Sequence, residues 1–200
     1  MATLTPITLS LLLILSLSTT FLHNTVAKSD IPSSDLIHAS CIHANYPQIC
    51  LRTLSTYAPP ATTPNDLAQA AVKISLTRSQ KASEFLSDLK HKSAKREKDA
   101  VSDCVSQMSD SVDELSRTLS ELKHLRRGIE FKWQMSNVET WVSAALTNED
   151  TCLDGFKEID GKVRSDVRRK ITNVARVTSN ALYLINLMDS QARRNFVPNP

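Results

Sequence analysis

The chain has 200 residues, of which 41% are hydrophobic and 22% are charged, and this ordinary globular composition excludes a disordered protein. The formal net charge of +3 is too small to indicate a nucleic-acid-binding protein. Only three glycines are present and aromatic residues make up 5% of the chain, so the sequence favours helices over tight turns and sheets. We therefore expect one all-α domain.

The first 27 residues contain no Asp, Glu, Lys or Arg and include an apolar run at 7–17. This run is shorter than the roughly 20 residues that span a membrane, and Thr25-Val26-Ala27 fits the small-x-small pattern of a cleavage site. We predict that residues 1–27 are a secretory signal peptide and that residues 28–200 form the secreted protein.

All four cysteines follow the predicted signal peptide: Cys41, Cys50, Cys104 and Cys152. An even number of cysteines in a secreted chain indicates disulfides, and four cysteines allow three pairings. We favour Cys41–Cys50 and Cys104–Cys152, because each bond then joins neighbouring predicted helices. The spacing lacks a Cys-x-x-Cys pair and the histidines are scattered, so we expect no metal site.

The first predicted elements are two short helices at 33–57, separated at Tyr46-Pro47. A Cys41–Cys50 bond would close them into a helical hairpin. A long helix is then predicted to begin after Thr63, because Thr63 can cap a helix that has Pro64 at its first position and Asp66 in its first turn.

Three more long helices follow, each with one apolar stripe. The clearest periodicity alternates steps of four and three, and we expect this helix to end near Arg126-Arg127-Gly128: its stripe is Val101, Val105, Met108, Val112, Leu115, Leu119 and Leu122. The capping-box spacing of Ser136 and Glu139 predicts the start of the next helix, which leaves Trp133 in the connection and places Trp141 on the apolar stripe. The last helix is predicted at 163–192. This pattern predicts an up-and-down four-helix bundle at 64–192 with the hairpin as an N-terminal extension.

Enzyme signatures are absent from the sequence. No G-x-S-x-G, H-E-x-x-H or glycine-rich phosphate loop occurs, so we predict a protein without catalytic residues or cofactors. Between positions 162 and 176 the only acid is Asp166, against six basic residues: Lys162, Arg164, Arg168, Arg169, Lys170 and Arg176. A solvated helix face is the simple interpretation, and a polyanion or acidic polymer as ligand is the alternative.

Residues 138–156 read VETWVSAALTNEDTCLDGF and closely resemble the signature segment of the plant invertase and pectin methylesterase inhibitor family. Three further features resemble that family: the hairpin around Tyr46-Pro47, Asp103-Cys104 followed by 110–115, and Asn180-Ala181-Leu182. The resemblance implies one inhibitor domain at 28–200, a four-helix bundle with a hairpin, the disulfide pairing given above, and a secreted protein of the plant apoplast and cell wall.

The pectin methylesterase inhibitors of this family cap the substrate cleft of the enzyme in a one-to-one complex. Carried over position by position, their contact residues correspond here to Asp110, Asp113 and Thr151. Inhibitors of this family often have a further acid two residues after the third cysteine, where this chain has Ser106. Helical geometry places Ser106, Asp110 and Asp113 opposite the predicted core stripe. Thr151 likewise turns away from the apolar face of its own helix, so we expect all four side chains to be exposed.

Two alternatives remain open. The first is an inhibitor of cell-wall or vacuolar invertase on the same fold; the resemblance associates that activity with a Pro-Lys-Phe tripeptide, which this chain lacks. The second, from another class, is a small-molecule or lipid carrier that would need a cavity between the helices.

Overall fold

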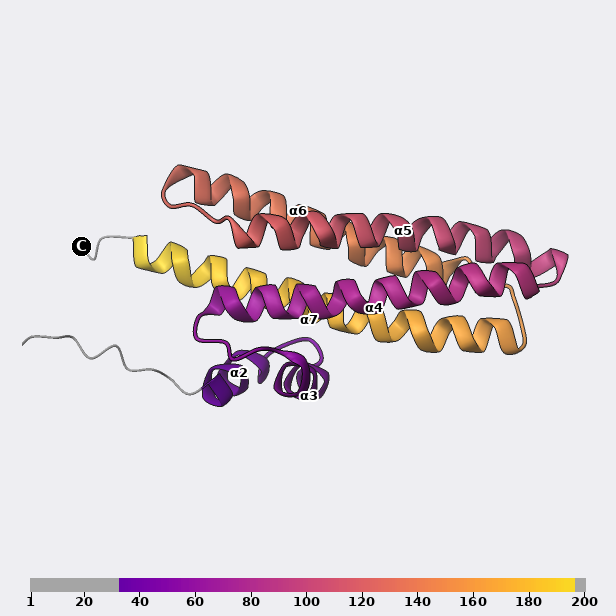
Figure 1. The fold of residues 1–200 in the computed structure, drawn as a ribbon, viewed down its shortest axis with the longest axis horizontal. Helices are drawn as coiled ribbons and strands as arrows, with labels where there is room; N and C mark the ends of the chain where they lie inside the picture. Colours follow the sequence, from indigo (N-terminus) through magenta and orange to yellow (C-terminus); the bar gives the residue numbers. More distant parts are fainter. Residues whose placement is uncertain (1–32, 197–200) are drawn as a thin grey trace, which may run out of the picture. The chain divides into compact units, whose positions relative to one another are not determined.

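The structure is a computed structural model that describes residues 33–196, and it contains six α-helices there (Figure 1). The predicted signal peptide at 1–27 lies outside the described residues. The helices are α2 (Ser33–Cys41), α3 (Pro47–Tyr57), α4 (Pro64–Lys92), α5 (Lys95–Lys123), α6 (Ile129–Asp154) and α7 (Lys162–Phe196). The predicted all-α fold, a four-helix bundle with a helical hairpin, is confirmed.

The four long helices form a closed ring. Helix α4 lies beside α5 and α7, and α6 also lies beside α5 and α7 (Figure 1). The connection between α4 and α5 is only two residues long, Ser93 and Ala94, which forces these two helices to run antiparallel. In this ring of neighbours, α5 and α6 form one side of the bundle, and α4 and α7 form the other.

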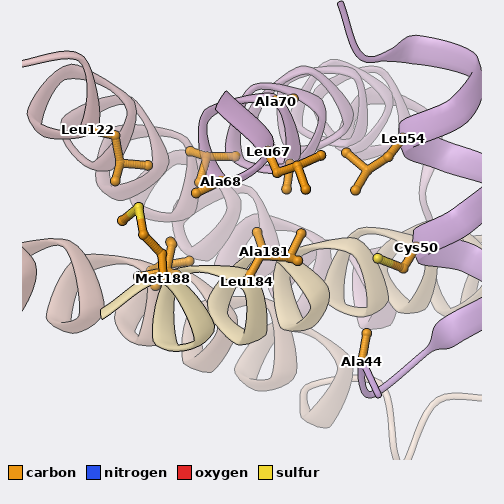
Figure 2. Packing of buried hydrophobic residues seen from close by; sticks show 14 of the residues in the cluster. Ala44, Cys50, Leu54, Leu67, Ala68, Ala70, Leu122, Ala181, Leu184 and Met188 are labelled. Atoms are coloured by element: carbon orange, nitrogen blue, oxygen red, sulfur yellow. The ribbon is translucent and has the colours of Figure 1, made fainter. Parts of the chain in front are cut away.

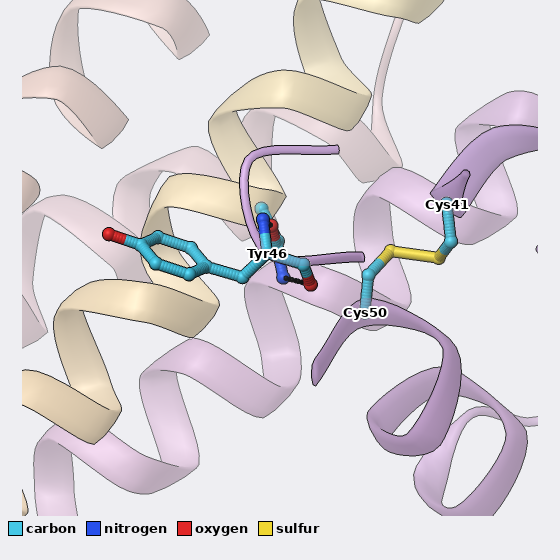
Figure 3. Close-up of a disulfide and its surroundings, with 4 residues drawn as sticks. Cys41, Tyr46 and Cys50 are labelled. Carbon is cyan, nitrogen blue, oxygen red and sulfur yellow. Dashed lines mark hydrogen bonds between the residues drawn. A yellow bond between two sulfur atoms is a disulfide. The ribbon is translucent and has the colours of Figure 1, made fainter. Parts of the chain in front are cut away.

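The hairpin of α2 and α3 is closed by a disulfide between Cys41 and Cys50, whose Cα atoms lie 5.6 Å apart (Figure 3). Asn180 of α7 fixes the turn of this hairpin. Its Oδ1 accepts a hydrogen bond from the Tyr46 amide at 2.9 Å, and its Nδ2 donates to the Tyr46 carbonyl at 3.0 Å. Pro47 then begins α3, as predicted.

Apolar packing also holds the hairpin on the bundle. Cys50 and Leu54 are buried, and they share one hydrophobic cluster with Leu67 of α4 and Ala181 of α7 (Figure 2). Burial of a leucine side chain such as Leu54 or Leu67 contributes roughly 1.5–3 kcal/mol to stability. The hairpin is therefore part of the folded core and not a separate appendage.

The predicted start of α4 is confirmed by a capping box. The Thr63 hydroxyl accepts a hydrogen bond from the Asp66 amide at 3.1 Å, and the Asp66 carboxylate accepts one from the Thr63 amide at 2.9 Å. Pro64 occupies the first turn, where its missing N–H costs nothing.

Two predicted boundaries between α5 and α6 are wrong. Helix α5 ends at Lys123, before the predicted end at 126–128. Gly128 precedes α6 with a φ of 74°, a backbone conformation that glycine adopts without strain, and α6 begins directly after it at Ile129 instead of at Ser136. Ser136 and Glu139 lie inside α6, because residues three apart on any helix have the spacing of a capping box. Trp133 is consequently part of α6.

The core consists of two apolar clusters separated by a polar layer. One cluster lies at the hairpin end and contains Leu115 and Ala145; the other lies at the opposite end and contains Met108 and Cys152. The predicted α5 stripe is only partly correct, because Val105, Val112 and Leu119 are half-buried. Between the clusters lie four buried polar side chains: Ser79, Ser111, Glu149 and Thr178.

The second disulfide joins α5 to α6. It links Cys104 to Cys152, whose Cα atoms lie 4.4 Å apart and whose sequence separation is 48 residues. In the chain-entropy model, a bond that closes a loop of this length stabilises the fold by about 4 kcal/mol, whereas the nine-residue Cys41–Cys50 separation gives about 3 kcal/mol.

We predict that the double substitution Cys104→Ala/Cys152→Ala lowers the free energy of unfolding by about 4 kcal/mol, because the unfolded chain regains the entropy of a long loop. Urea unfolding followed by circular dichroism measures this loss. Cys41→Ala/Cys50→Ala is the comparison, and it should cost less. A larger loss from the hairpin bond would contradict the loop-length explanation.

Candidate partner-binding surface

The predicted contact residues lie on the outer side of α5 and α6. Ser106 follows Cys104 by two residues and Thr151 directly precedes Cys152, so the disulfide brings these two segments together at one end of the helices. Asp110 and Asp113 lie further along α5. A rise of 1.5 Å per residue gives a stripe of roughly 10 Å between positions 106 and 113.

The exposure predicted for these side chains is confirmed. Ser106, Asp110 and Asp113 on α5 and Thr151 on α6 are all exposed, while Met108 and Ser111 on the inner side of α5 are fully buried. A helix turns by 100° per residue, so burial of one side directs the other to solvent. For convenience, we call the four exposed residues the α5–α6 surface.

The α5–α6 surface carries two carboxylates and two hydroxyl groups. Neither Asp110 nor Asp113 forms an ion pair within residues 33–196. The Thr151 hydroxyl donates to the Thr147 carbonyl at 2.8 Å, which leaves its oxygen lone pairs for an outside donor. This arrangement suits a partner with basic side chains, because carboxylates accept charged hydrogen bonds from Arg and Lys.

Directly beneath this surface lies a buried acid, Glu149, which was not among the predicted site residues. The Glu149 side chain is 0% exposed. Its Oε1 accepts hydrogen bonds from Ser111 at 2.8 Å, Thr178 at 3.0 Å and Ser79 at 3.4 Å. These hydroxyls belong to α5, α7 and α4, so one carboxyl group from α6 contacts all three other bundle helices. The second oxygen, Oε2, is buried without a hydrogen-bond partner among the described residues.

Burial strongly affects the ionisation of Glu149. The pKa of this carboxyl is raised to about 7, mainly because burial removes the solvation of the charged form. The neighbouring charge of Asp150 also raises the pKa, whereas the three hydroxyl donors lower it. The group is therefore protonated at mildly acidic pH. A hint was present in the sequence, because Glu149 lies four residues after Ala145 and three before Cys152, on the apolar stripe of α6.

The two tryptophans occupy different environments on α6. Trp141 is only half-buried, although its place on the predicted stripe suggested a core position. Trp133 is 69% exposed, and Ile129, one turn before it, is 73% exposed. This exposure leaves Trp133 available for contact with a partner.

The space between the hairpin and the bundle is too small for a small-molecule ligand. The apolar hollow there, lined in part by Cys50, Leu54 and Leu184, measures about 10 Å³, room for about one water molecule.

Within residues 33–196, no group of three or more His, Cys, Asp or Glu side chains could hold a metal ion. No helix in that range is long and apolar enough to cross a membrane.

The structure is a disulfide-linked helical bundle with an exposed polar stripe on α5 and α6. The family model described as plant invertase/pectin methylesterase inhibitor matches residues 35–184. The chain belongs to this family. The domain that defines the family is an inhibitor domain, so the protein is not an enzyme.

Comparison with individual proteins supports the same family. The chain is 53% identical to Pectinesterase inhibitor 3 of Arabidopsis thaliana over 165 residues, which cover 78% of this chain and 80% of the relative. It is 47% identical to the 21 kDa protein of Daucus carota over 80% of this chain and 86% of that protein. Among solved structures, a mutant form of a pectin methylesterase inhibitor from Arabidopsis matches with a TM-score of 0.63 and 22% identity, over 78% of this chain and 97% of that one, which shows a shared fold.

We predict that Glu149 makes the fold less stable as the pH rises. Its folded pKa of about 7 lies above the ordinary value of 4.5, so the folded protein binds the proton more tightly than the unfolded chain does. The stabilisation is complete below pH 4.5 and is lost progressively up to pH 7, by about 3 kcal/mol in total. Glu149→Gln, which remains neutral, should lack this loss.

Urea unfolding of both proteins between pH 4 and 8 measures the effect as a difference. The stability of Glu149→Gln relative to the unsubstituted protein should rise across this range. Glu84→Gln, at an exposed position of α4, serves as the control. Parallel pH profiles for the unsubstituted protein and Glu149→Gln would show that Glu149 ionises at its ordinary pKa.

Proposed function

We propose that this chain is a secreted inhibitor of pectin methylesterase that binds the enzyme one-to-one and occludes its substrate cleft. Membership of the family and 53% identity to Pectinesterase inhibitor 3 support this target. The proposal includes removal of the signal peptide at 1–27, a single inhibitor domain at 28–200, and action in the apoplast and cell wall, where pectin is found.

The observation that carries the proposed binding mode is the exposed, unpaired acidic stripe of α5. Asp110 and Asp113 would contact basic groups of the enzyme, while Ser106 and Thr151 would supply hydrogen bonds. The Cys104–Cys152 bond and the Glu149 hydrogen bonds hold α5 and α6 in place beneath this surface. A surface that is ordered before binding loses little entropy in the complex. Inhibition is then steric and needs no chemical step.

Parallel activity titrations test the function directly. The oxidised, purified protein is added to a plant pectin methylesterase and to a cell-wall invertase at mildly acidic pH. We expect methylesterase activity to fall linearly and vanish at one equivalent, with invertase unaffected. Loss of invertase activity alone would establish the alternative target. If neither enzyme were affected, the chain would share the fold of the family but the proposed activity would be refuted.

We predict that Asp110→Lys/Asp113→Lys weakens inhibition of pectin methylesterase at least tenfold, because the substitutions place like charges against basic groups of the enzyme. The inhibition constant is measured by titration. The matched control is Glu84→Lys/Asp88→Lys, which makes the same change in charge at exposed positions of α4. Equal weakening by both pairs would indicate a general charge effect and would rule out the α5–α6 surface as the specific contact.

We also predict a gain of affinity from Ser106→Glu. This substitution places an acid two residues after Cys104, where related inhibitors often have one, and it extends the acidic stripe by one helical turn. The inhibition constant should fall by about threefold to tenfold, which corresponds to roughly 1 kcal/mol. Ser87→Glu, at an exposed position of α4, should leave the constant unchanged. Unchanged or weaker inhibition by Ser106→Glu would place this position outside the contact.

A further inference from the structure

A basic groove lies along α4 and α7. One hollow of about 310 Å³ is lined from both helices, by Arg78 and Lys81 of α4 and by Arg169 and Lys170 of α7, among others. A second hollow of about 310 Å³ follows α4 and is lined by Lys73, Arg78 and Lys81 together with apolar and hydroxyl side chains. The hollows share Arg78 and Lys81 and therefore adjoin. We call them together the α4–α7 groove.

Positive charge in the α4–α7 groove is only partly compensated. Its five charged lining residues are all basic. Arg169 forms an ion pair with Asp166 at 3.0 Å, and neither Lys73 nor Lys81 forms one within residues 33–196. A concentration of one sign of charge in a hollow attracts ligands of the opposite sign.

Several of these cations are held in position rather than extended freely into solvent. Nη1 of Arg78 donates a hydrogen bond to Asn173 Oδ1 at 2.8 Å, which links α4 to α7 across the groove. The Lys170 ammonium lies 4.6 Å from the centre of the Phe85 ring. Preorganised guanidinium and ammonium groups favour carboxylate ligands, because less side-chain entropy is lost on binding.

The groove also offers surfaces for the faces of sugar rings. Ile74 of α4, which is half-buried, contributes apolar side-chain surface to the second hollow. Further along α7, on the helix face of Arg169 and Asn173, the Arg176 guanidinium lies 5.4 Å from the centre of the Tyr46 ring, and Tyr46 is 39% exposed. Cations beside apolar and aromatic surface suit a polymer of acidic sugars, which presents both carboxylates and ring faces.

We propose that the α4–α7 groove binds de-esterified pectin, a linear polymer of uronic acids. This inference rests on the proposed function, because a pectin methylesterase converts neutral methyl esters into the carboxylates that the groove would recognise. The site is separate from the α5–α6 surface, since α4 and α7 occupy the other side of the helical ring. The protein can therefore hold the polymer and the enzyme at the same time, which places the inhibitor where product has accumulated.

Isothermal titration calorimetry of the purified protein with polygalacturonate fragments, without any enzyme, tests this proposal. We expect binding to polygalacturonate that weakens as the salt concentration rises, and no binding to the same fragments after full methylesterification. Lys81→Glu/Arg169→Glu should lower the affinity at least tenfold. Lys123→Glu/Lys132→Glu, an equal change in charge at exposed positions outside the groove, should have little effect. If the charge reversal in the groove impairs folding, Lys81→Gln/Arg169→Gln replaces it, with a smaller loss.

Three results would overturn the proposal: equal binding of methylesterified fragments, equal losses in the groove and control variants, or equally tight binding of dextran sulfate or DNA at physiological salt. The last would mean non-specific attraction of polyanions. Inhibition of the methylesterase, measured separately with fully methylesterified substrate below its saturating concentration, should be unchanged in the groove variants. If the protein inhibits the enzyme but does not bind the polymer, only the proposed polymer site in the groove is refuted. If it binds the polymer but does not inhibit the enzyme, the proposed function is refuted.

Discussion

One buried carboxyl group, that of Glu149, connects all four helices of the bundle. Hydroxyl groups from α4, α5 and α7 converge on one of its oxygens, and this polar layer separates the two apolar clusters of the core. If any helix slid along its axis, a buried polar group would lose its partner, at a cost of about 1–3 kcal/mol. Apolar side chains alone tolerate such shifts more easily, so we infer that this layer fixes the alignment of the helices.

The proposed contact surface depends on that alignment. Ser111, which donates to Glu149, lies in the chain between Asp110 and Asp113, so the inward hydrogen bond directs both carboxylates outward. On α6, Glu149 and Cys152 point into the core while Thr151 between them faces solvent. The residues that stabilise the core thus also orient the side chains of the α5–α6 surface. The Cys104–Cys152 bond fixes α5 and α6 relative to one another at one end of this surface.

Local signals in the sequence predicted the features that depend on neighbouring residues: the hairpin turn at Tyr46-Pro47, the capping box of Thr63, and the exposure of the α5–α6 surface. The predicted start of α6 was wrong because a Ser and a Glu three residues apart fit a helix interior as well as a helix end. The hydrogen-bond partners of Glu149 could not be predicted, because they come from three other helices. Similarly, the basic run at 162–176 was visible, but its apposition to Arg78 and Lys81 requires the packed bundle.

A crystal structure of the protein bound to a plant pectin methylesterase would test most directly whether α5 and α6 form the inhibitory surface. We expect the substrate cleft of the enzyme to be covered by these two helices, with Asp110 and Asp113 beside basic side chains and Thr151 within the interface. The α4–α7 groove should remain open to solvent in that complex. An enzyme seated instead on the α2–α3 hairpin, on the exposed Ile129 and Trp133, or in the α4–α7 groove would contradict this assignment.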